Sequence, residues 1–300
     1  MKTDRKFLDS AVIARLSRLQ VLARKPMIGS VTGIHRSAHR GSSVEFAEYR
    51  KYVPGDDIRH LDWRVYARTD KFFMKDFEAD TNLRCYLVLD ASGSMAFSSH
   101  HGSKFDYAVR LAGTLAYLLA EQGDAVGLSY FAGDTVKEIP ARRTPSHLKH
   151  IFDTMAEIQP SGKTQIIQLI HDMAEKIKRR AMVIIFSDLF TDVHQVLDCF
   201  QHMRFRKHDL AVFHILDRQE LNFDFERPIR FVDLESPTSL LTDPAVIRRT
   251  YQELLTGFLK EIKRGCEEFN VDYQFVVTDS DYEAVLASFL LQRMRNKPQK

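Results

Sequence analysis

The sequence has few cysteines, and their placement excludes a disulfide framework or a zinc site. The three residues Cys85, Cys199 and Cys266 are widely spaced and include no CxxC pair. Disulfide scaffolds and structural zinc sites need larger sets of cysteines, or of cysteine and histidine, at closer spacing. We therefore expect free thiols, which are typical of proteins in a reducing cytoplasm.

The sequence also lacks a long apolar run. No stretch approaches the roughly 18–20 uninterrupted apolar residues that a membrane-spanning helix requires. The start, MKTDRKFLDSAVIARLSRLQ, has no apolar core followed by a small-residue cleavage site, so we expect neither a signal peptide nor an anchor. With 300 residues, of which 44% are hydrophobic, the chain can nevertheless bury a large core.

The net charge of +3 is small but unevenly distributed. Residues 1–75 contain 16 Lys/Arg and 8 Asp/Glu, a charge of +8, which leaves 3 − 8 = −5 for the rest of the chain. A basic leading segment can contact an acidic protein, nucleic acid or lipid. Because its positive charges are interleaved with acids and form no block, we favour a solvated surface with internal ion pairs. Nucleic-acid binding through this segment is kept as an alternative.

The first 80 residues are predicted to form a helix and a small β-rich subdomain. Residues 7–23 repeat apolar residues at helical spacing, and this pattern ends near Pro26. Turn residues follow at 54–57. The segment LDWRVYARTDKFFMKDFEAD (61–80) suggests strand pieces with a turn at Thr69-Asp70. We place a domain boundary near residue 80.

Residues 81–300 show alternating strand and helix patterns. Short apolar runs at 85–90, 125–131, 182–188 and 210–217 predict buried strands, and amphipathic stretches between them predict helices. Such alternation is typical of a mostly parallel, doubly wound α/β sheet with helices on both faces. We predict this fold from about residue 80 to 220. A strand at 229–234, a helix over 244–268, a strand at 273–279 and a final helix are expected to pack onto it.

Polar side chains gather at three predicted loops, where functional crevices of open α/β sheets lie. The first loop is Asp90-Ala91-Ser92-Gly93-Ser94, the second ends in Lys163-Thr164, and the third is Ser187-Asp188. They supply carboxylates and hydroxyls without His or Cys. Oxygen ligands of this kind favour a hard cation, Mg²⁺ first, with Mn²⁺ or Ca²⁺ as alternatives. The predicted metal residues are Asp90, Ser92, Ser94, Thr164 and Asp188.

This set resembles the metal-ion-dependent adhesion site of von Willebrand factor A domains. The DxSxS sequence at 90–94, Thr164 and Asp188 match that site in order and in placement at strand ends. The resemblance implies that the two serines and Thr164 bind the metal directly, and that Asp90 and Asp188 act mostly through water. It also implies a free coordination position that an acidic side chain of a partner protein completes.

The leading segment carries a second resemblance. Residues 33–80 are similar to the hallmark region of the domain-of-unknown-function-58 family, in which an R-x-Y-x-x-G-D-D-x-R-x-x-D-W core precedes a von Willebrand A-like domain. That core matches Arg50, Tyr52, Gly55, Asp56, Asp57, Arg59, Asp62 and Trp63. The resemblance implies an adaptor that works with a MoxR-type AAA+ ATPase in maturing other proteins or inserting metal cofactors. Many members carry transmembrane helices; this chain resembles the soluble kind.

Four basic residues are candidates for partner contacts. Lys163 precedes a predicted metal ligand and is interpreted as an exposed charge that could touch an acidic ligand. Arg50, Arg59 and Arg68 are expected to pair with the acids of the hallmark core, and an anion or partner surface is the second interpretation.

Enzyme patterns are incomplete in this sequence, so we expect a binding protein. Gly162-Lys163-Thr164 resembles the end of a phosphate-binding P-loop, but the required first glycine is replaced by Glu157. A haloacid-dehalogenase-type phosphatase needs a second Asp where Ser92 stands, and the G-x-S-x-G pattern of serine hydrolases is absent. A Mg²⁺-dependent phosphoester hydrolase remains the leading alternative.

Overall fold

The computed structural model describes most of the chain in two compact units. The described residues are 7–23, 35–36, 45–51, 63–69, 72–78, 80–81, 83–133, 135–225, 227, 229–235 and 238–295. One unit comprises Met1–Arg24 together with Arg84–Lys300, and the other comprises Lys25–Leu83. The predicted boundary near residue 80 lies close to this division.

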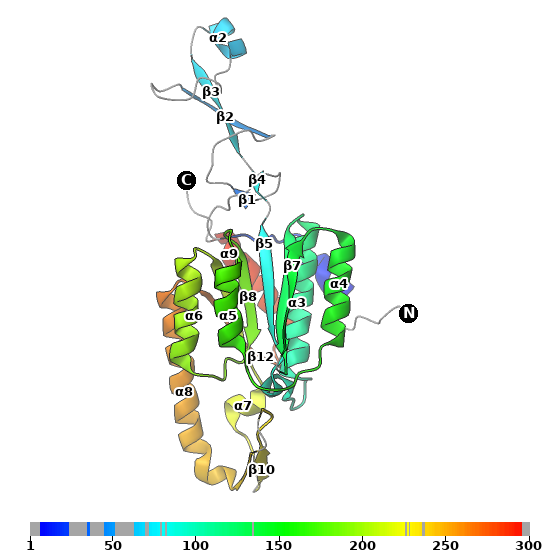
Figure 1. The fold of residues 1–300 in the computed structure, drawn as a ribbon, viewed down its shortest axis with the longest axis vertical. Coiled ribbons are helices and arrows are strands. Elements are labelled where there is room, and N and C mark those ends of the chain that lie inside the picture. The colour runs from blue at the N-terminus through cyan, green and yellow to red at the C-terminus, as the bar shows by residue number, and fades with distance from the viewer. Residues whose placement is uncertain are drawn as a thin grey trace. The chain divides into compact units, whose positions relative to one another are not determined.

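The larger unit is built on one six-stranded sheet (Figure 1). Neighbouring strands are parallel except at one edge, where the last two are antiparallel. In spatial order the strands are β12 (Asp272–Val277), β9 (Asp209–Leu216), β8 (Met182–Ser187), β5 (Arg84–Asp90), β6 (Ala125–Ala132) and β7 (Thr135–Arg142). The unit is therefore a mostly parallel α/β fold, which confirms the predicted fold class.

The burial of each strand's side chains agrees with its position in the sheet. Strands β8 and β9 are buried along their whole length, as expected for apolar runs covered on both faces of a parallel sheet. Strand β7 contains Pro140 and lies at the edge, where a missing N–H does not interrupt the sheet.

Helices cover the sheet in two groups. Helices α5 (Ile166–Lys176), α6 (Val193–Phe205) and α8 (Pro244–Glu268) pack against one another, and their apolar residues join Val88, Val183 and Val212 of the sheet in one core cluster. Helices α1 (Ser10–Leu16), α3 (Lys104–Glu121), α4 (Pro145–Glu157) and α9 (Tyr282–Arg295) form the second group around α3. No helix among the described residues is long and apolar enough to cross a membrane.

Two parts of the larger unit differ from the predicted division. Helix α1, expected in the leading subdomain, packs on α3 and α9, and Arg15 donates to Glu283 over 2.6 Å. Strand β12, expected to pack onto a domain ending near 220, is instead a parallel strand of the main sheet beside β9. Both contacts join segments far apart in sequence, so local patterns could not reveal them.

The described residues of the smaller unit form short antiparallel strand pairs and a helix. Strand β2 (Glu45–Lys51) pairs with β3 (Phe73–Glu78), and β1 (His35–Arg36) pairs with β4 (Asp80–Thr81). Residues Trp63–Thr69 form helix α2, so the strand predicted there is wrong. The helix places Trp63 and Tyr66 one turn apart with ring centroids 6.2 Å from each other, and Tyr66 stacks on Phe72.

A hairpin projects at the end of the sheet where the central strands finish (Figure 1). It consists of β10 (Ile229–Val232) and β11 (Ser239–Thr242), paired antiparallel, and follows the short helix α7 (Arg218–Asn222). Phe231 of β10 stacks on Phe223, whose ring in turn lies 4.4 Å from that of Tyr251 in α8. This aromatic cluster anchors the base of the hairpin.

Candidate metal site

Asp90 is the last residue of β5, a central strand of the sheet, and its side chain is fully buried. Its Oδ1 accepts the backbone N–H of Ser92 at 2.9 Å, and its Oδ2 accepts the hydroxyl of Ser187 at 2.5 Å. Burial raises the pKa of Asp90 to about 7, and the nearby negative charge of Asp188 acts in the same direction. These contacts fix the carboxylate in place without supplying a positive charge.

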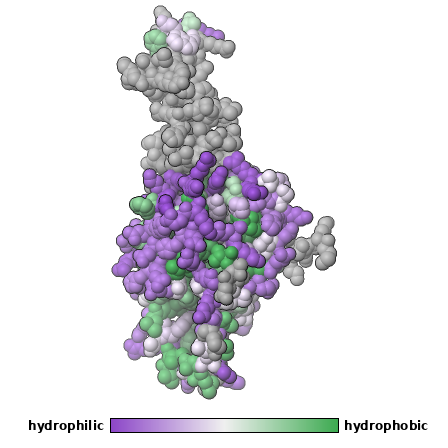
Figure 2. Space-filling model, viewed as in Figure 1, coloured by the Kyte–Doolittle hydropathy of each residue, from purple (hydrophilic) through white to green (hydrophobic). Residues whose placement is uncertain are grey.

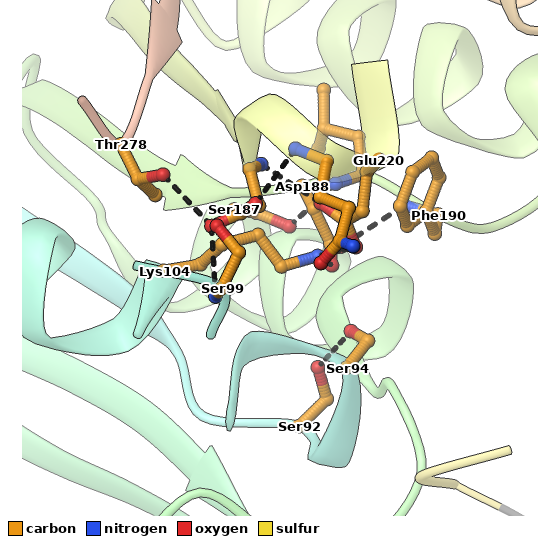
Figure 3. A network of polar contacts seen from close by, with 12 residues as sticks. Ser92, Ser94, Ser99, Lys104, Ser187, Asp188, Phe190, Glu220 and Thr278 are labelled. Atoms are coloured by element: carbon orange, nitrogen blue, oxygen red, sulfur yellow. Dashed lines mark hydrogen bonds and ion pairs between the residues drawn. The ribbon is translucent and has the colours of Figure 1, made fainter. Parts of the chain in front are cut away.

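The two serines of the DxSxS sequence face one another. A 3-10 turn, η2 (Gly93–Ala96), begins directly after Ser92 and brings the hydroxyl oxygens of Ser92 and Ser94 to 3.0 Å (Figure 3). Two neighbouring oxygen ligands of an octahedral Mg²⁺, each at its usual bond length, lie about 2.9 Å apart. The serine pair therefore has the spacing of two adjacent ligands of such an ion.

The loop before α5 is held against the DxSxS loop by backbone hydrogen bonds. Gly93 donates to the carbonyl of Gly162 at 2.9 Å, and Ser161 donates to the carbonyl of Ala91 at 2.8 Å. Gly162 has a φ of +76°, and a Cβ there would lie 2.6 Å from Gly133 Cα. Only glycine satisfies both constraints, so this residue sets the loop that carries Thr164 to the site.

Asp188 follows β8, the neighbour of β5 in the sheet, and is fully buried. Its Oδ2 lies 2.7 Å from Nζ of Lys104, and its Oδ1 accepts the backbone N–H of Phe190. The same ammonium lies 2.6 Å from Oε1 of Glu220 (Figure 3). Burial lowers the pKa of Lys104, but the two carboxylates outweigh it and raise the pKa above its usual value.

The buried cluster carries an excess of negative charge when its members are ionised. Asp90, Asp188 and Glu220 contribute −3 and Lys104 contributes +1, so the sum is −3 + 1 = −2. Burial raises the pKa of Glu220, as it does for Asp90. A net charge of −2 beside two hydroxyls is the chemistry of a site for a divalent cation. The residues present thus fit the predicted metal.

Thr164 makes a contact that the sequence did not reveal. Its backbone N–H donates to Oε2 of Glu235 at 3.0 Å, and its hydroxyl donates to Oε1 at 2.8 Å. Glu235 lies between the hairpin strands, 71 residues further along the chain. A carboxylate of the chain itself therefore binds one of the predicted metal residues.

The predicted partner-binding residues are divided between the two units of the chain. Lys163 is exposed beside Thr164. Arg68 is exposed on α2 and Arg50 lies on β2 opposite Met74, both in the smaller unit. Arg59 and the acids of the hallmark core lie outside the described residues. Their pairing therefore stays a prediction.

Sequence reasoning missed Lys104, Glu220 and Glu235. Lys104 opens a helix with a Ser103 capping box, a position where a cation is disfavoured by the helix dipole, and this was the one available signal. Glu220 belongs to a capping box with Asp217 and looks like ordinary helix-start chemistry. Glu235 has no local pattern at all, because its partner Thr164 is distant in sequence.

The larger unit, a mostly parallel sheet covered by helices, has a von Willebrand factor A-like fold. The profile of the family described as "Protein of unknown function DUF58" matches residues 48–257. Because this match covers more than half of the chain, the protein belongs to that family.

Curated proteins are similar to this chain in sequence. An uncharacterised protein of Mycobacterium bovis is 25% identical over 292 residues, which cover 96% of this chain and 91% of that protein. The uncharacterised protein YeaD of Bacillus subtilis is 26% identical over 118 residues, or 39% of this chain and 27% of that protein.

Among solved structures, the conserved hypothetical protein BatB from Bacteroides thetaiotaomicron superposes with a TM-score of 0.47 at 18% identity. The superposition covers 72% of this chain and 100% of BatB. The SpRpn10 VWA domain superposes with a TM-score of 0.42 at 10% identity, over 73% of this chain and 99% of that domain.

Proposed function

We propose that this protein is a metal-dependent protein-interaction module that binds an acidic residue of a partner through a divalent cation. The observation that carries the proposal is the convergence of the 3.0 Å serine pair with two buried carboxylates from neighbouring strands. Ser92, Ser94 and Thr164 would hold Mg²⁺ directly, with Asp90 and Asp188 acting mostly through water. The cation would supply a Lewis-acidic position for a partner carboxylate.

The ligand chemistry supports magnesium over zinc. Among the described residues, no group of three or more His, Cys, Asp or Glu side chains is placed to hold a metal ion. A zinc site would need such a group. Hydroxyls and carboxylates instead match the hard cations, Mg²⁺ first and Mn²⁺ or Ca²⁺ after it.

A binding role is favoured over hydrolysis by the hydrogen bonds of the carboxylates. Both oxygens of Asp90 and both oxygens of Asp188 already accept a hydrogen bond or an ion pair. A general base for water activation needs a carboxylate or imidazole directed at the attacking water. We therefore propose that the protein is not an enzyme.

We propose an adaptor role with a MoxR-type AAA+ ATPase as the partner. This rests on membership of the family and on the fold, which is suited to protein contacts. The three cysteines are free and buried, which supports a reducing compartment such as the cytoplasm.

Calorimetric titration of Mg²⁺ and Mn²⁺ tests the metal site. We expect the metal-free protein to bind one ion and the Ser92→Ala/Ser94→Ala variant to bind none, while both show the same far-UV circular dichroism. Ser98→Ala, at an exposed serine just beyond the site, is the matched control and should bind as the wild type does.

Affinity for a candidate ATPase is then measured in Mg²⁺ and in EDTA. We expect binding only in Mg²⁺, with loss in the double serine variant. Equal affinity for the ATPase in Mg²⁺ and in EDTA would show that the contact does not pass through the metal and would overturn the proposal.

A further inference from the structure

The turn of the β10–β11 hairpin lies directly on the candidate metal site. Glu235 accepts two hydrogen bonds from Thr164, one from the backbone N–H and one from the hydroxyl, at 3.0 and 2.8 Å. A carboxylate whose two oxygens both accept hydrogen bonds from one residue is held in a defined orientation. Its position is the one that an acidic ligand approaching Thr164 would take.

The preceding residue also touches the site. A Cβ on Gly93 would lie 2.1 Å from the carbonyl oxygen of Leu234, so the hairpin turn rests against the backbone of the DxSxS loop. Such an approach is open only to glycine. The dipeptide Leu234-Glu235 therefore runs across two of the three loops that form the site.

A cavity lies beside this dipeptide. It has a volume of about 390 Å³, opens next to Ser94, and is lined by Leu234 and by the aromatic rings of Phe223, Phe225, Phe231 and Tyr251. Pockets of this size and composition take apolar groups. Phe231 is stacked on Phe223, so these two walls of the cavity support one another.

The outer surface around the cavity is also apolar. Figure 2 shows hydrophobic residues gathered at the lower end of the molecule, over the hairpin and the start of α8. The exposed members are Val232, Leu234, Leu240, Leu241, Val246 and Leu254. Exposed apolar residues gathered in this way beside a polar site are typical of a surface that contacts another protein.

We infer that the partner segment recognised at this site has an apolar residue directly before a carboxylate, and that Leu234-Glu235 is an internal copy of that ligand. This inference rests on the proposed function. The partner carboxylate replaces Glu235 at Thr164, and the apolar side chain before it enters the aromatic cavity. The internal copy competes with the partner. The apparent affinity for the partner therefore falls in proportion to the fraction of molecules in which the site is uncovered.

A peptide copy of the turn provides the probe. The octapeptide FVDLESPT (231–238) carries the native dipeptide, and its matched controls carry Leu234→Ala or Glu235→Gln. Each peptide is titrated in Mg²⁺ against the full-length wild type, the Glu235→Ala variant and the Glu253→Ala variant. Glu253 is an exposed carboxylate on α8 and controls for the loss of one negative charge.

We expect the native peptide to bind Glu235→Ala at least about ten-fold more tightly than the wild type or Glu253→Ala, since charged hydrogen bonds of the internal copy are removed. The Leu234→Ala peptide should bind about ten-fold more weakly than the native one, because a leucine side chain is no longer buried. The Glu235→Gln peptide should show no binding.

A second measurement separates the outcomes. Amide hydrogen exchange at Thr164 should be faster in Glu235→Ala than in the wild type, and saturating native peptide should slow it again. Equal peptide affinity in the wild type and Glu235→Ala would overturn the inference. So would the absence of peptide binding to Glu235→Ala, because the Glu235 contact would then be only an internal brace.

Repeating the peptide titration in EDTA distinguishes this inference from the proposed metal dependence. Peptide binding that persists in EDTA would overturn the metal role while the recognition of Leu-Glu stands. Metal binding without any peptide preference would leave the metal site intact and overturn the ligand class.

Discussion

At the scale of single residues, Lys104 distinguishes this site from a metal site that is lined by oxygen atoms alone. Its ammonium is fully buried, contacts Asp188 and Glu220, and lies 5.0 Å from the ring centre of Phe190. Without it, the carboxylates of Asp188 and the partly buried Glu220 would lie near one another with no positive charge between them. The lysine compensates one of the negative charges of this cluster.

Replacing Lys104 with Met should destabilise the metal-free protein and increase the stabilisation that Mg²⁺ provides. Removing one partner of a buried ion pair leaves an uncompensated charge and lowers the free energy of unfolding by roughly 3–5 kcal/mol. Because the cluster then has a net charge of −3, Mg²⁺ should stabilise the variant more than the wild type. Urea unfolding in EDTA and in Mg²⁺ measures both effects.

Lys176→Met is the control for this prediction. Lys176 is an exposed lysine that pairs with Glu138 on the surface, so its loss should change stability by less than about 1 kcal/mol. If Lys104→Met were as stable in EDTA as the control, the ammonium would not be what stabilises the buried carboxylates.

The placement of Asp90 and Asp188 at neighbouring strand ends could be predicted because it depends on chain order alone. Asp90 and Asp188 each follow an apolar run, and carboxyl ends of parallel strands meet at one edge of the sheet. The bond between Thr164 and Glu235 could not be predicted, since no sequence period links residues so far apart. The placement of Lys104 could not be predicted either, because its buried ammonium pairs with two acids that are distant in sequence.

At the scale of elements, sequence signals succeeded where local chemistry decides the structure. The predicted helix 244–268 is found as α8 because Asp243 caps it and Pro244 occupies its first turn. The segment 61–80 is predicted to hold strand pieces with a turn at Thr69-Asp70, but residues Trp63–Thr69 form α2, since strand propensity is a weak and context-dependent signal. Strand β12 was found, but its membership of the main sheet needed the three-dimensional pairing with β9.

Alanine substitutions at two glycines in different elements should change the free energy of unfolding in opposite directions. In β6, a Cβ on Gly127 would lie 2.8 Å from the carbonyl of Ile139 and 2.9 Å from the backbone nitrogen of Ala141, both in β7. Gly127→Ala should push the edge strand away and destabilise the protein by about 1–3 kcal/mol. In α8, Gly257 has open space around it, so Gly257→Ala should stabilise the protein by up to about 1 kcal/mol.

Urea unfolding of the two variants beside the wild type measures these changes. The pair serves as its own control, because both substitutions add the same methyl group. A stabilising Gly127→Ala would show that the close approach of β6 and β7 is relaxed in solution.

At the scale of the whole molecule, the site and the core belong to one unit. Apart from Leu83, the last residue of the smaller unit, the buried side chains that the structure describes lie within residues 12–22 and 85–293. All the predicted metal residues lie in this unit as well, whereas the hallmark core lies in the other. The division therefore places the candidate metal site and the hallmark core in different units.

The larger unit should fold without the smaller one. Leu22 and Cys85, on either side of the smaller unit, both lie near Met182: Arg293 contacts the carbonyl of Leu22 and the sulfur of Met182, and Cys85 pairs with Met182 in the sheet. A short Gly/Ser linker can therefore replace residues 25–82. We expect this deletion variant to unfold cooperatively and to bind Mg²⁺ as the full-length chain does.

The contrasting variant lacks residues 1–82 and so also loses α1. Val12, Leu16, Val21 and Leu22 are buried against the α3 and α9 side of the unit, and each contributes about 1.5–3 kcal/mol through burial. Removing them should abolish cooperative unfolding or cause aggregation, measured by thermal denaturation and light scattering. If the 25–82 deletion failed in the same way, the smaller unit would be part of the folding core, and the metal site would depend on it.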